Sequence, residues 1–391
     1  MALMIKKKIW IITGSRAEFG ILYPLIKNLQ AEKKFKTEVV VSGHHFNKKQ
    51  GLSINEVKKS KIKNVIFSKS HLKDTSTLLV SLYSSKIVKD FTLLYKKHKP
   101  NMVIVLGDRY EILSSILPLI FFKIPIIHFN GGEKTSGSFD DQIRHIITKI
   151  SNYHFVANKE YKNRVIQLGE NPKSIFNFGG ISNFIDKKNL LPKNEIINKL
   201  NLNPNLKIVL STFHPETNKS KKYNIDAFNI LLDCLKNLKK TNIVLTYPNL
   251  DPGSSELIKI LNKLEKKKYK NIYIFKSLGR KNYLSLMKQA NLVIGNSSSG
   301  IIETSIFNTP CINLGNRQQG RILTKNIINC DFQKNKIIKN INFVFSNSFR
   351  KVIKNYPKNK VNMNKIIKKI GKLIDTKYAP KTFFDLNKIL Y

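Results

Sequence analysis

Short apolar runs alternate with amphipathic stretches along most of the chain. Apolar runs of about four to eight residues are typical of strands buried in a parallel sheet, and the stretches between them have helical periodicity. The alternation therefore predicts repeated β-α units and an α/β fold with parallel sheets. In the first half of the chain, strands are expected at 9–12, 38–41, 64–67, 102–106, 125–129, 154–157 and 175–178.

The pattern is interrupted by a polar stretch rich in Lys and Asn, residues 186–205, which contains Pro192 and Pro204. It then starts again, which predicts a second α/β domain. We expect domains at 1–185 and 186–365, and a helical tail at 366–391 that packs back on the first domain. The strands expected in the second domain are 207–212, 242–246, 271–275, 292–295 and 310–313.

Composition supports a globular protein of the cytoplasm. Hydrophobic residues make up 41% of the chain, and the three cysteines lie far apart with no CxxC pair or zinc spacing. The most apolar stretch, 112–129, is broken by Lys123, so it falls short of the roughly 18 uninterrupted apolar residues of a membrane span. The N-terminal apolar run is too short for a signal peptide. We therefore expect reduced thiols, no membrane partner and a cytoplasmic location.

The formal charge of +44, from 69 Lys and Arg against 25 Asp and Glu, invites a nucleic-acid interpretation. However, the lysines are scattered in pairs and triplets, without the aromatic spacing of RNA-binding motifs. Lys, Asn and Ile are abundant together, and all three have codons rich in A and T. A solvated basic surface is therefore favoured, with no specific nucleic-acid partner. Such a surface attracts anionic substrates, including nucleotide sugars.

The first strand is followed by the sequence TGSRAEFG, which begins at Thr13. In a turn between strand and helix, Gly14 lets the backbone approach a ligand, and Arg16 can form paired hydrogen bonds to a phosphate. The alternative is an ordinary tight loop. The spacing matches neither the dinucleotide fingerprint nor the P-loop.

Acidic residues follow two further strands of the first domain. Asp108 comes directly after one strand, Glu133 after the next, and Asp140 and Asp141 open the following helix. The carboxyl ends of parallel strands meet at one edge, so these groups are expected together, where paired carboxylates suit acid and base catalysis. Alternatively, Asp108 is a helix cap, and Asp140 and Asp141 cap a helix while Arg144 neutralises them.

The second domain offers a histidine and a serine-rich turn at strand ends. His214 is placed to carry a proton or bind phosphate, although a solitary histidine is often structural. Ser297, Ser298 and Ser299 follow a strand and open a helix, where hydroxyls and free N–H groups can hold a diphosphate. Glu303, one turn later, can accept from ribose hydroxyls. The alternative is a helix cap with additional serines.

In this order, the motifs resemble the UDP-N-acetylglucosamine 2-epimerase family, and especially its hydrolysing branch. The resemblance covers nearly the whole chain and implies two Rossmann-like domains facing a cleft, the GT-B arrangement. It rests on TGSRAEFG at Thr13, GDRYE at Gly107, HFNGGEKTSGSFDDQIRHIITK at His128, FHPET at Phe213, YPNLDPGS at Tyr247, GNSSSGIIE at Gly295 and PCINLGNRQQGR at Pro310.

The resemblance implies how the site residues divide. Members of the hydrolysing branch eliminate the nucleoside diphosphate from a nucleotide sugar, and hydration of the resulting glycal gives a free manno-configured sugar for sialic or legionaminic acid synthesis. No cofactor or metal is expected. The protein is expected to form a homodimer or a homotetramer. The residues implied for the diphosphate are Arg16, Ser297, Ser298, Ser299, Glu303 and Arg321, and those implied around the sugar are Asp108, Glu133, Asp140 and His214.

The chain departs from the wider family at Asn130, where relatives that do not hydrolyse their substrate have a carboxylate. We therefore expect Glu133 to be the base that removes the C2 proton, with Asp140 in support and Asp141 as the near alternative. Asn130 and Arg144 are then expected to contact substrate. The rival enzyme is a GT-B glycosyltransferase, which would pass the sugar to an acceptor instead of water.

Overall fold

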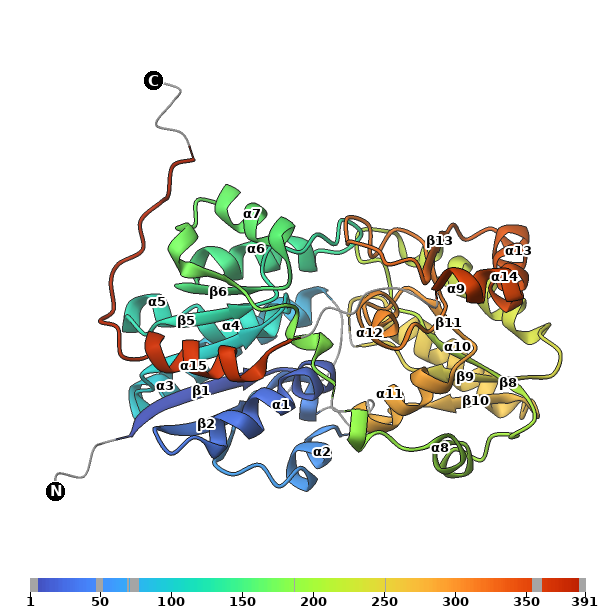
Figure 1. Cartoon of the computed structure of the whole chain (residues 1–391), viewed down its shortest axis with the longest axis horizontal. Helices are drawn as coiled ribbons and strands as arrows, with labels where there is room; N and C mark the ends of the chain where they lie inside the picture. The colour runs from blue at the N-terminus through green and yellow to red at the C-terminus, as the bar shows by residue number, and fades with distance from the viewer. Residues whose placement is uncertain are drawn as a thin grey trace.

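Two parallel β-sheets, each with helices on both faces, lie side by side in the molecule (Figure 1). The computed structural model describes residues 6–46, 52–68, 70, 77–185, 187–249, 251–353 and 361–386. The predicted fold class, two Rossmann-like α/β domains in a GT-B arrangement, is confirmed. Each predicted strand has a counterpart, and the sheet order places the carboxyl ends of the central strands at the boundary between the two domains.

The first sheet has the order β3-β2-β1-β4-β5-β6-β7. Its strands are β1 (Lys7–Thr13), β2 (Phe35–Val41), β3 (Val65–Phe67), β4 (Met102–Leu106), β5 (Ile126–Phe129), β6 (Tyr153–Val156) and β7 (Ile175–Asn177). The helices that accompany it are α1 (Arg16–Ala31), α2 (Ile54–Lys59), α3 (Thr77–His98), α4 (Tyr110–Ile116), α5 (Leu119–Phe122), α6 (Asp140–Ile150) and α7 (Lys159–Gln167), with short 3₁₀ turns η1 (Gly43–Phe46), η3 (Pro172–Ser174) and η4 (Ile181–Asn183).

The second sheet has the order β10-β9-β8-β11-β12-β13. Its strands are β8 (Lys207–Thr212), β9 (Thr241–Thr246), β10 (Ile272–Phe275), β11 (Leu292–Gly295), β12 (Cys311–Leu314) and β13 (Ile327–Cys330). Its helices are α8 (Lys193–Lys199), α9 (Lys221–Lys236), α10 (Ser254–Lys266), α11 (Gly279–Gln289), α12 (Ser299–Phe307), α13 (Lys334–Phe345) and α14 (Asn347–Ile353), and the 3₁₀ turn η5 (Lys187–Asn189) precedes α8.

Successive side chains of the central strands point to opposite faces, so each sheet separates two apolar cores. In β1, Ile9 and Ile11 pack with α1, whereas Trp10 and Ile12 pack with α3 and α4 on the other face. The second sheet repeats this arrangement. Burial on both faces explains why the central strands are continuous apolar runs in the sequence.

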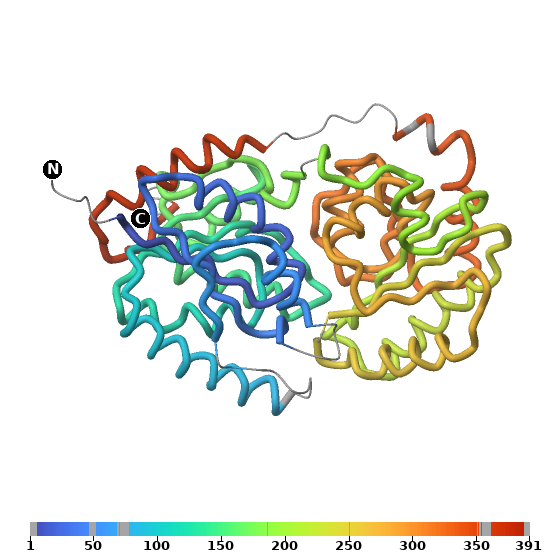
Figure 2. Tube along the Cα trace, turned by 90° about the horizontal axis from the view of Figure 1, so that it is seen from below, coloured from blue at the N-terminus to red at the C-terminus, as the bar shows by residue number. Residues whose placement is uncertain are grey.

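The last helix, α15 (Met363–Leu373), packs on the first sheet rather than on the second. Its buried face, which includes Met363, Ile366 and Ile370, joins the core formed by α1 and β1. Figures 1 and 2 show α15 along the outside of the first domain, whereas α14, the helix before it, lies in the second. The residues after Leu373 up to 386 are not helical.

The helical tail expected at 366–391 is helical only as far as Leu373 within the described residues, and two other details also differ from the sequence expectations. The polar stretch 186–205 contains the helix α8, whose Ile196 and Ile197 are buried in the core of the second domain. The strand β13, which pairs with β12 at the edge of the second sheet, was not predicted. Within the described ranges, no helix combines the length and apolarity that crossing a bilayer requires.

Candidate active site between the two domains

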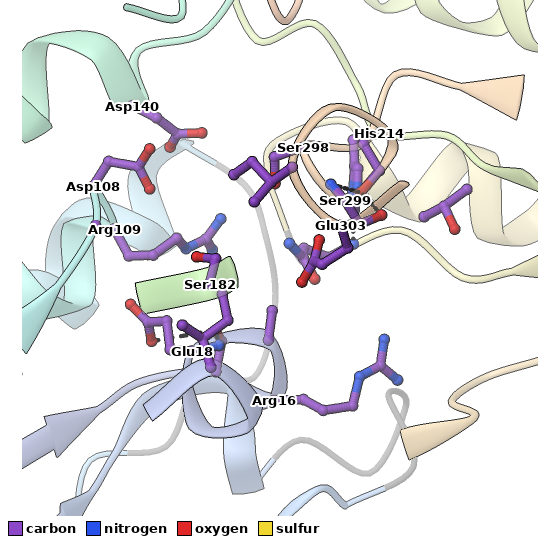
Figure 3. A pocket seen from close by; sticks show the side chains of 18 of the residues that line it. Arg16, Glu18, Asp108, Arg109, Asp140, Ser182, His214, Ser298, Ser299 and Glu303 are labelled. Carbon is purple, nitrogen blue, oxygen red and sulfur yellow. Dashed lines mark hydrogen bonds between the residues drawn. The ribbon is translucent and has the colours of Figure 1, made fainter. Parts of the chain in front are cut away.

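The candidate site is a cleft between the domains, at the carboxyl ends of the strands of both sheets. Asp108 and Asp140 point into it from the first domain, and His214 and the serines of the 297–299 turn face them from the second (Figure 3). Parallel sheets bind ligands at such edges because the strand-to-helix loops gather there. The cleft is lined by Arg16, Asp108, Asn130, Glu133, Asp140, Arg144, His214, Ser297, Ser298, Ser299, Glu303 and Arg321.

Asp108, whose side chain is 22% exposed, forms an ion pair with the buried Arg144, which comes from α6. Arg144 is 1% exposed, and its Nη1 atom also donates to the Glu133 carbonyl oxygen at 2.9 Å. Burial alone would raise the pKa of Asp108, but the positive charges of Arg144, Arg321 and Arg109 lower it below its usual range. Asp108 therefore stays ionised in the closed cleft.

Asp140 lies in a different electrostatic environment, although it is a neighbour of Asp108. Its Oδ2 atom accepts from Ser138 Oγ at 2.8 Å and lies 3.4 Å from Arg317 Nη2 of the second domain. Burial, followed by the negative charges of Asp108 and Asp251, raises the pKa of Asp140 to about 6. One carboxyl group is thus held ionised while the other can carry a proton near neutral pH, a division that suits an acid and a base.

Glu133, the predicted base, is buried and paired across the cleft with Arg321, whose Nη1 atom lies 2.5 Å from Glu133 Oε2. Asn130 follows β5 with φ of 64°, and its Nδ2 atom donates to Ser182 Oγ at 3.3 Å. Its Oδ1 atom is buried and has no hydrogen-bond partner among the described residues. Both side chains line the cleft, and their contact with a sugar stays a prediction.

Asp141 does not cap α6, whose N-cap is Phe139 and has no side-chain capping bond, but it does pair with Arg144 as the alternative interpretation expected. Its Oδ1 atom accepts from the Thr135 backbone N–H at 2.5 Å and lies 3.3 Å from Arg144 Nη1. Burial would raise its pKa, but hydrogen bonds from His145 and Thr135, with the charge of Arg144, lower it to about 2. Asp141 therefore ties the loop before α6 in place, which leaves Asp140 as the acidic residue of α6 that enters the cleft.

His214 is fixed in one orientation by its neighbours. The Asn249 backbone N–H donates to His214 Nδ1 at 3.1 Å, so the proton of the neutral ring is on Nε2. The Asn296 side chain bonds both the N–H and the carbonyl of His214, at 2.7 and 2.8 Å. Burial, followed by the charge of Arg317, lowers the pKa of His214 to about 3. The ring is therefore a neutral hydrogen-bond donor at physiological pH.

The serine turn lies at the N-terminus of α12. Ser298 is the N-cap and makes no side-chain capping bond, whereas Ser299 Oγ lies 2.8 Å from Tyr283 Oη and 3.0 Å from Ser297 Oγ. A helix N-terminus that is lined with hydroxyls attracts anions. Glu303, one turn later, pairs with Arg280 at 3.0 Å.

Arg16 reaches across the domain boundary in this structure. Its Nη1 atom donates to the Lys276 carbonyl oxygen at 3.2 Å, and Figure 3 shows the side chain extended toward the second domain, apart from the serines. Its binding to a diphosphate stays a prediction. No group of three or more His, Cys, Asp or Glu side chains within the described ranges is placed to hold a metal ion.

Comparison with known proteins identifies the family. The profile of UDP-N-acetylglucosamine 2-epimerases matches residues 27–371. The chain belongs to this family. It is 38% identical over 330 residues to GDP/UDP-N,N'-diacetylbacillosamine 2-epimerase (hydrolyzing) of Campylobacter jejuni, with 84% of this chain and 85% of the relative covered. It is 33% identical over 388 residues to polysialic acid biosynthesis protein P7 of Escherichia coli, with 97% and 98% covered.

Solved structures of the epimerase family have the same fold. The enzyme from Neisseria meningitidis bound to UDP-GlcNAc superposes with a TM-score of 0.74 at 17% identity, covering 94% of this chain and 99% of that one. The Methanocaldococcus jannaschii enzyme, in complex with UDP-GlcNAc and UDP, gives 0.73 at 19% identity with the same coverage. At this level of identity the similarity concerns the fold.

The cleft of this epimerase-family chain also contains charged residues that the sequence analysis did not select. Arg109, Asp251 and Arg317 are buried. Arg109 pairs with Asp251, and Arg317 pairs with Asp140, across the domain boundary, while Arg317 and Asp251 pair within the second domain. These three residues lie within the motifs GDRYE, YPNLDPGS and GNRQQGR, so the motifs already marked the segments that contain them. Each residue alone resembled an ordinary loop charge, because their pairing depends on how the domains meet.

Proposed function

We propose that this protein is a hydrolysing 2-epimerase that acts on a nucleotide-linked N-acetylated sugar and releases a free manno-configured sugar. The observation that carries the proposal is the cleft itself. Asp108, Glu133 and Asp140 of the first domain face the serine-lined N-terminus of α12 across it. One side supplies acid and base groups to a sugar, and the other supplies donors to a leaving diphosphate.

In the first step, the C1–O bond breaks, the C2 proton leaves, and a C1–C2 double bond forms. The C2 proton is poorly acidic, so loss of the leaving group must run ahead and its negative charge must be stabilised. We assign that task to His214 Nε2–H, Arg16 and the N-terminus of α12. Glu133 takes the proton, and its partner Arg321 is then available to the departing diphosphate.

In the second step, water adds across the double bond. Its hydroxyl group goes to C1, and a proton is added to C2 on the face opposite to the one from which Glu133 removed the first proton. Asp108, which Arg144 keeps ionised, orients and deprotonates the water. Asp140, which can carry a proton near pH 6, donates to C2. The products are a free sugar inverted at C2 and the nucleoside diphosphate, and all atoms of water and substrate are accounted for.

The relatives support hydrolysis and a class of substrate. The relatives from Campylobacter jejuni and Legionella pneumophila are both diacetylbacillosamine 2-epimerases of the hydrolysing type. The P7 relative is a polysialic acid biosynthesis protein. We therefore propose UDP-N-acetylglucosamine or a UDP- or GDP-linked diacetamido-trideoxy sugar as substrate, and synthesis of nonulosonic acids, sialic or legionaminic, as the purpose of the product.

Proton NMR in heavy water tests the proposal with the purified protein. UDP-N-acetylglucosamine and the UDP- and GDP-linked diacetamido sugars are offered separately. A free manno-configured sugar with deuterium at C2, accompanied by nucleoside diphosphate, is the expected result and names the substrate. Release of no sugar from any of them would contradict the proposal. Transfer that requires an added acceptor would instead identify a glycosyltransferase.

The homodimer or homotetramer and the cytoplasmic location stay predictions. Self-association is supported by apolar side chains on α3 and α5, on the outer side of the first domain in Figure 1. Where α3 and α5 meet, at the contact of Tyr95 with Phe122, Phe121 is 81% exposed, Leu93 58% and Ile120 44%. Exposed apolar surface of this kind is typical of an interface, and a patch that meets its own copy gives a twofold dimer.

A further inference from the structure

A chain of buried charges connects the two domains at the cleft. Arg109 Nη1 lies 2.6 Å from Asp251 Oδ1, Arg317 Nη2 lies 3.7 Å from Asp251 Oδ2, and the same Nη2 atom lies 3.4 Å from Asp140 Oδ2. Arg109 and Asp140 belong to the first domain, whereas Asp251 and Arg317 belong to the second. The series therefore crosses the domain boundary twice and ends on Asp140.

The backbones around this series are in close contact. A Cβ atom on Gly137 would lie 2.5 Å from the carbonyl oxygen of Asn316 and 2.6 Å from the Cα atom of Arg317. The Ser136 backbone N–H also donates to the Gln319 carbonyl at 3.1 Å. The loop before α6 and the loop after β12 thus touch directly, so the ion pairs lie where the two domains contact each other.

Asp251 is central to the series, because it is the carboxylate that both arginines share. It is 1% exposed, and its Oδ2 atom accepts no hydrogen bond among the described residues. Burial would raise the pKa of Asp251, but Arg109, Arg317 and His214 lower it far below its usual range. Asp251 therefore keeps a full negative charge in the closed protein.

This charge acts on Asp140 in two ways. The groups that face Asp140 are the anions Asp108 and Asp251, the cations Arg109 and Arg317, and the hydroxyl of Ser138. Asp251 repels the ionised form of Asp140 directly. It also holds both arginines, whose positive charges would otherwise act on Asp140 without opposition.

We propose that Asp251 is a positioning residue of the second domain that favours the protonated form of Asp140 in the first. The inference rests on the proposed function, in which Asp140 returns a proton to C2. Burial and the nearby Asp108 act in the same direction, and Asp251 adds a contribution from the second domain. The proton donor of the first domain is therefore adjusted by a residue of the second.

The first test follows turnover against pH in Asp251→Asn, which removes the charge and keeps the shape. Loss of the Asp140 proton limits turnover at the alkaline side of the profile. Removing the negative charge lowers the pKa of Asp140, so this limb is expected to move to lower pH. Arg317→Gln removes a positive charge and should move the limb to higher pH, so opposite shifts are expected. Asp226→Asn, an exposed change of equal charge in the second domain, should cause no shift.

The second test separates the inference from the proposed function. In protein labelled with carboxyl-¹³C aspartate, the Asp140 signal is assigned by its loss in Asp140→Asn and titrated in the presence of UDP. Its midpoint should fall in Asp251→Asn, whether or not any sugar is turned over. If the midpoint and the alkaline limb both stay at their wild-type pH while turnover drops, Asp251 has only a structural role and the inference is overturned.

Discussion

Arg144 and Asp108 form an ion pair at the base of the cleft, between α6 and the loop after β4. Arg144 is 1% exposed, so its charge acts on Asp108 through little intervening water. The pair explains how Asp108 remains ionised despite its burial, and it connects the two strand ends that carry the acidic groups.

Replacing Asp108 with Asn should therefore remove a carboxylate that catalysis needs, while nucleotide binding stays largely intact. We expect kcat to fall by about 10² to 10⁴, the usual range for loss of an acid or base, and UDP affinity to change little. Asp141→Asn is the matched control, because Asp141 contacts the same arginine but ties a loop. Steady-state kinetics and calorimetry with UDP measure both effects. Normal turnover in Asp108→Asn would remove Asp108 from the mechanism.

In this structure, Arg16 donates a hydrogen bond to a backbone carbonyl oxygen of the second domain. A bound diphosphate can replace that carbonyl oxygen as the acceptor and pair with the positive charge of Arg16. We expect Arg16→Ala to weaken UDP binding by about 10- to 100-fold, from the roughly 1.5–3 kcal/mol of a charged hydrogen bond. Calorimetry with UDP gives the dissociation constant. Lys221→Ala, on the exposed start of α9, serves as a control for loss of positive charge. Equal affinity in the two variants would refute the role of Arg16.

His214 is expected to act as a neutral donor and not as a titrating acid. Burial lowers its pKa to about 3, so its charge state stays constant from pH 5 to 9. Its ring should therefore show the Nε2–H tautomer throughout this range in ¹⁵N NMR. His214→Ala should lower kcat by about 10² to 10³, as for loss of a donor to a developing negative charge. An imidazole that titrates near pH 6.5 would contradict the prediction.

The sequence predicted the strands well, because buried parallel strands form continuous apolar runs that are hard to mistake. Helix α8 was harder, because its segment KNEIINK is mostly polar and only Ile196 and Ile197 enter the core. Strand β13 is short and lies at the sheet edge, and the local sequence does not reveal its pairing with β12.

The first-domain carboxylates were predictable because strand order and strand ends place them at one edge. Their separate roles were not, because these depend on which groups pack against each carboxylate in the folded chain. Asp108 and Asp140 look equivalent in the sequence, yet Arg144 pairs with the first, whereas burial, Asp108 and Asp251 favour protonation of the second. Such a difference arises only from contacts between residues that are far apart in the sequence.

Self-association through α3 and α5 can be tested by placing a charge in the apolar surface. Phe121→Asp, at a side chain that is 81% exposed, should leave the fold intact and lower the mass measured by light scattering toward that of one chain. Ile338→Asp on α13 of the second domain, at 37% exposure, is the control and should not change the mass. An unchanged oligomer in Phe121→Asp would place the interface elsewhere.

Lys381 anchors the segment that follows α15 to the end of α6. Its Nζ atom donates to the carbonyl oxygens of Thr148, Lys149 and Ser151 at 3.2, 2.5 and 2.7 Å, and it pairs with Glu170 at 2.7 Å. A positive charge at a helix C-terminus is favourable, because the last carbonyls carry partial negative charge. The anchor thus steadies the helix that carries Asp140 at its other end.

Lys381→Met should lower the free energy of unfolding by about 1–3 kcal/mol, the usual cost of leaving a buried polar group without its partner. Burial would raise the pKa of Glu170, but its bonds to His154, Lys149 and Lys381 lower it to about 2. A lowered folded pKa gives stability that is full above the unfolded value of about 4.3 and is lost as pH falls toward 2. The difference in the free energy of unfolding between variant and wild type should therefore be largest at pH 7 and smaller at pH 3, as measured by urea unfolding. Lys377→Met, at an exposed position of the same segment, is the control, and an equal loss in both variants would contradict the anchor.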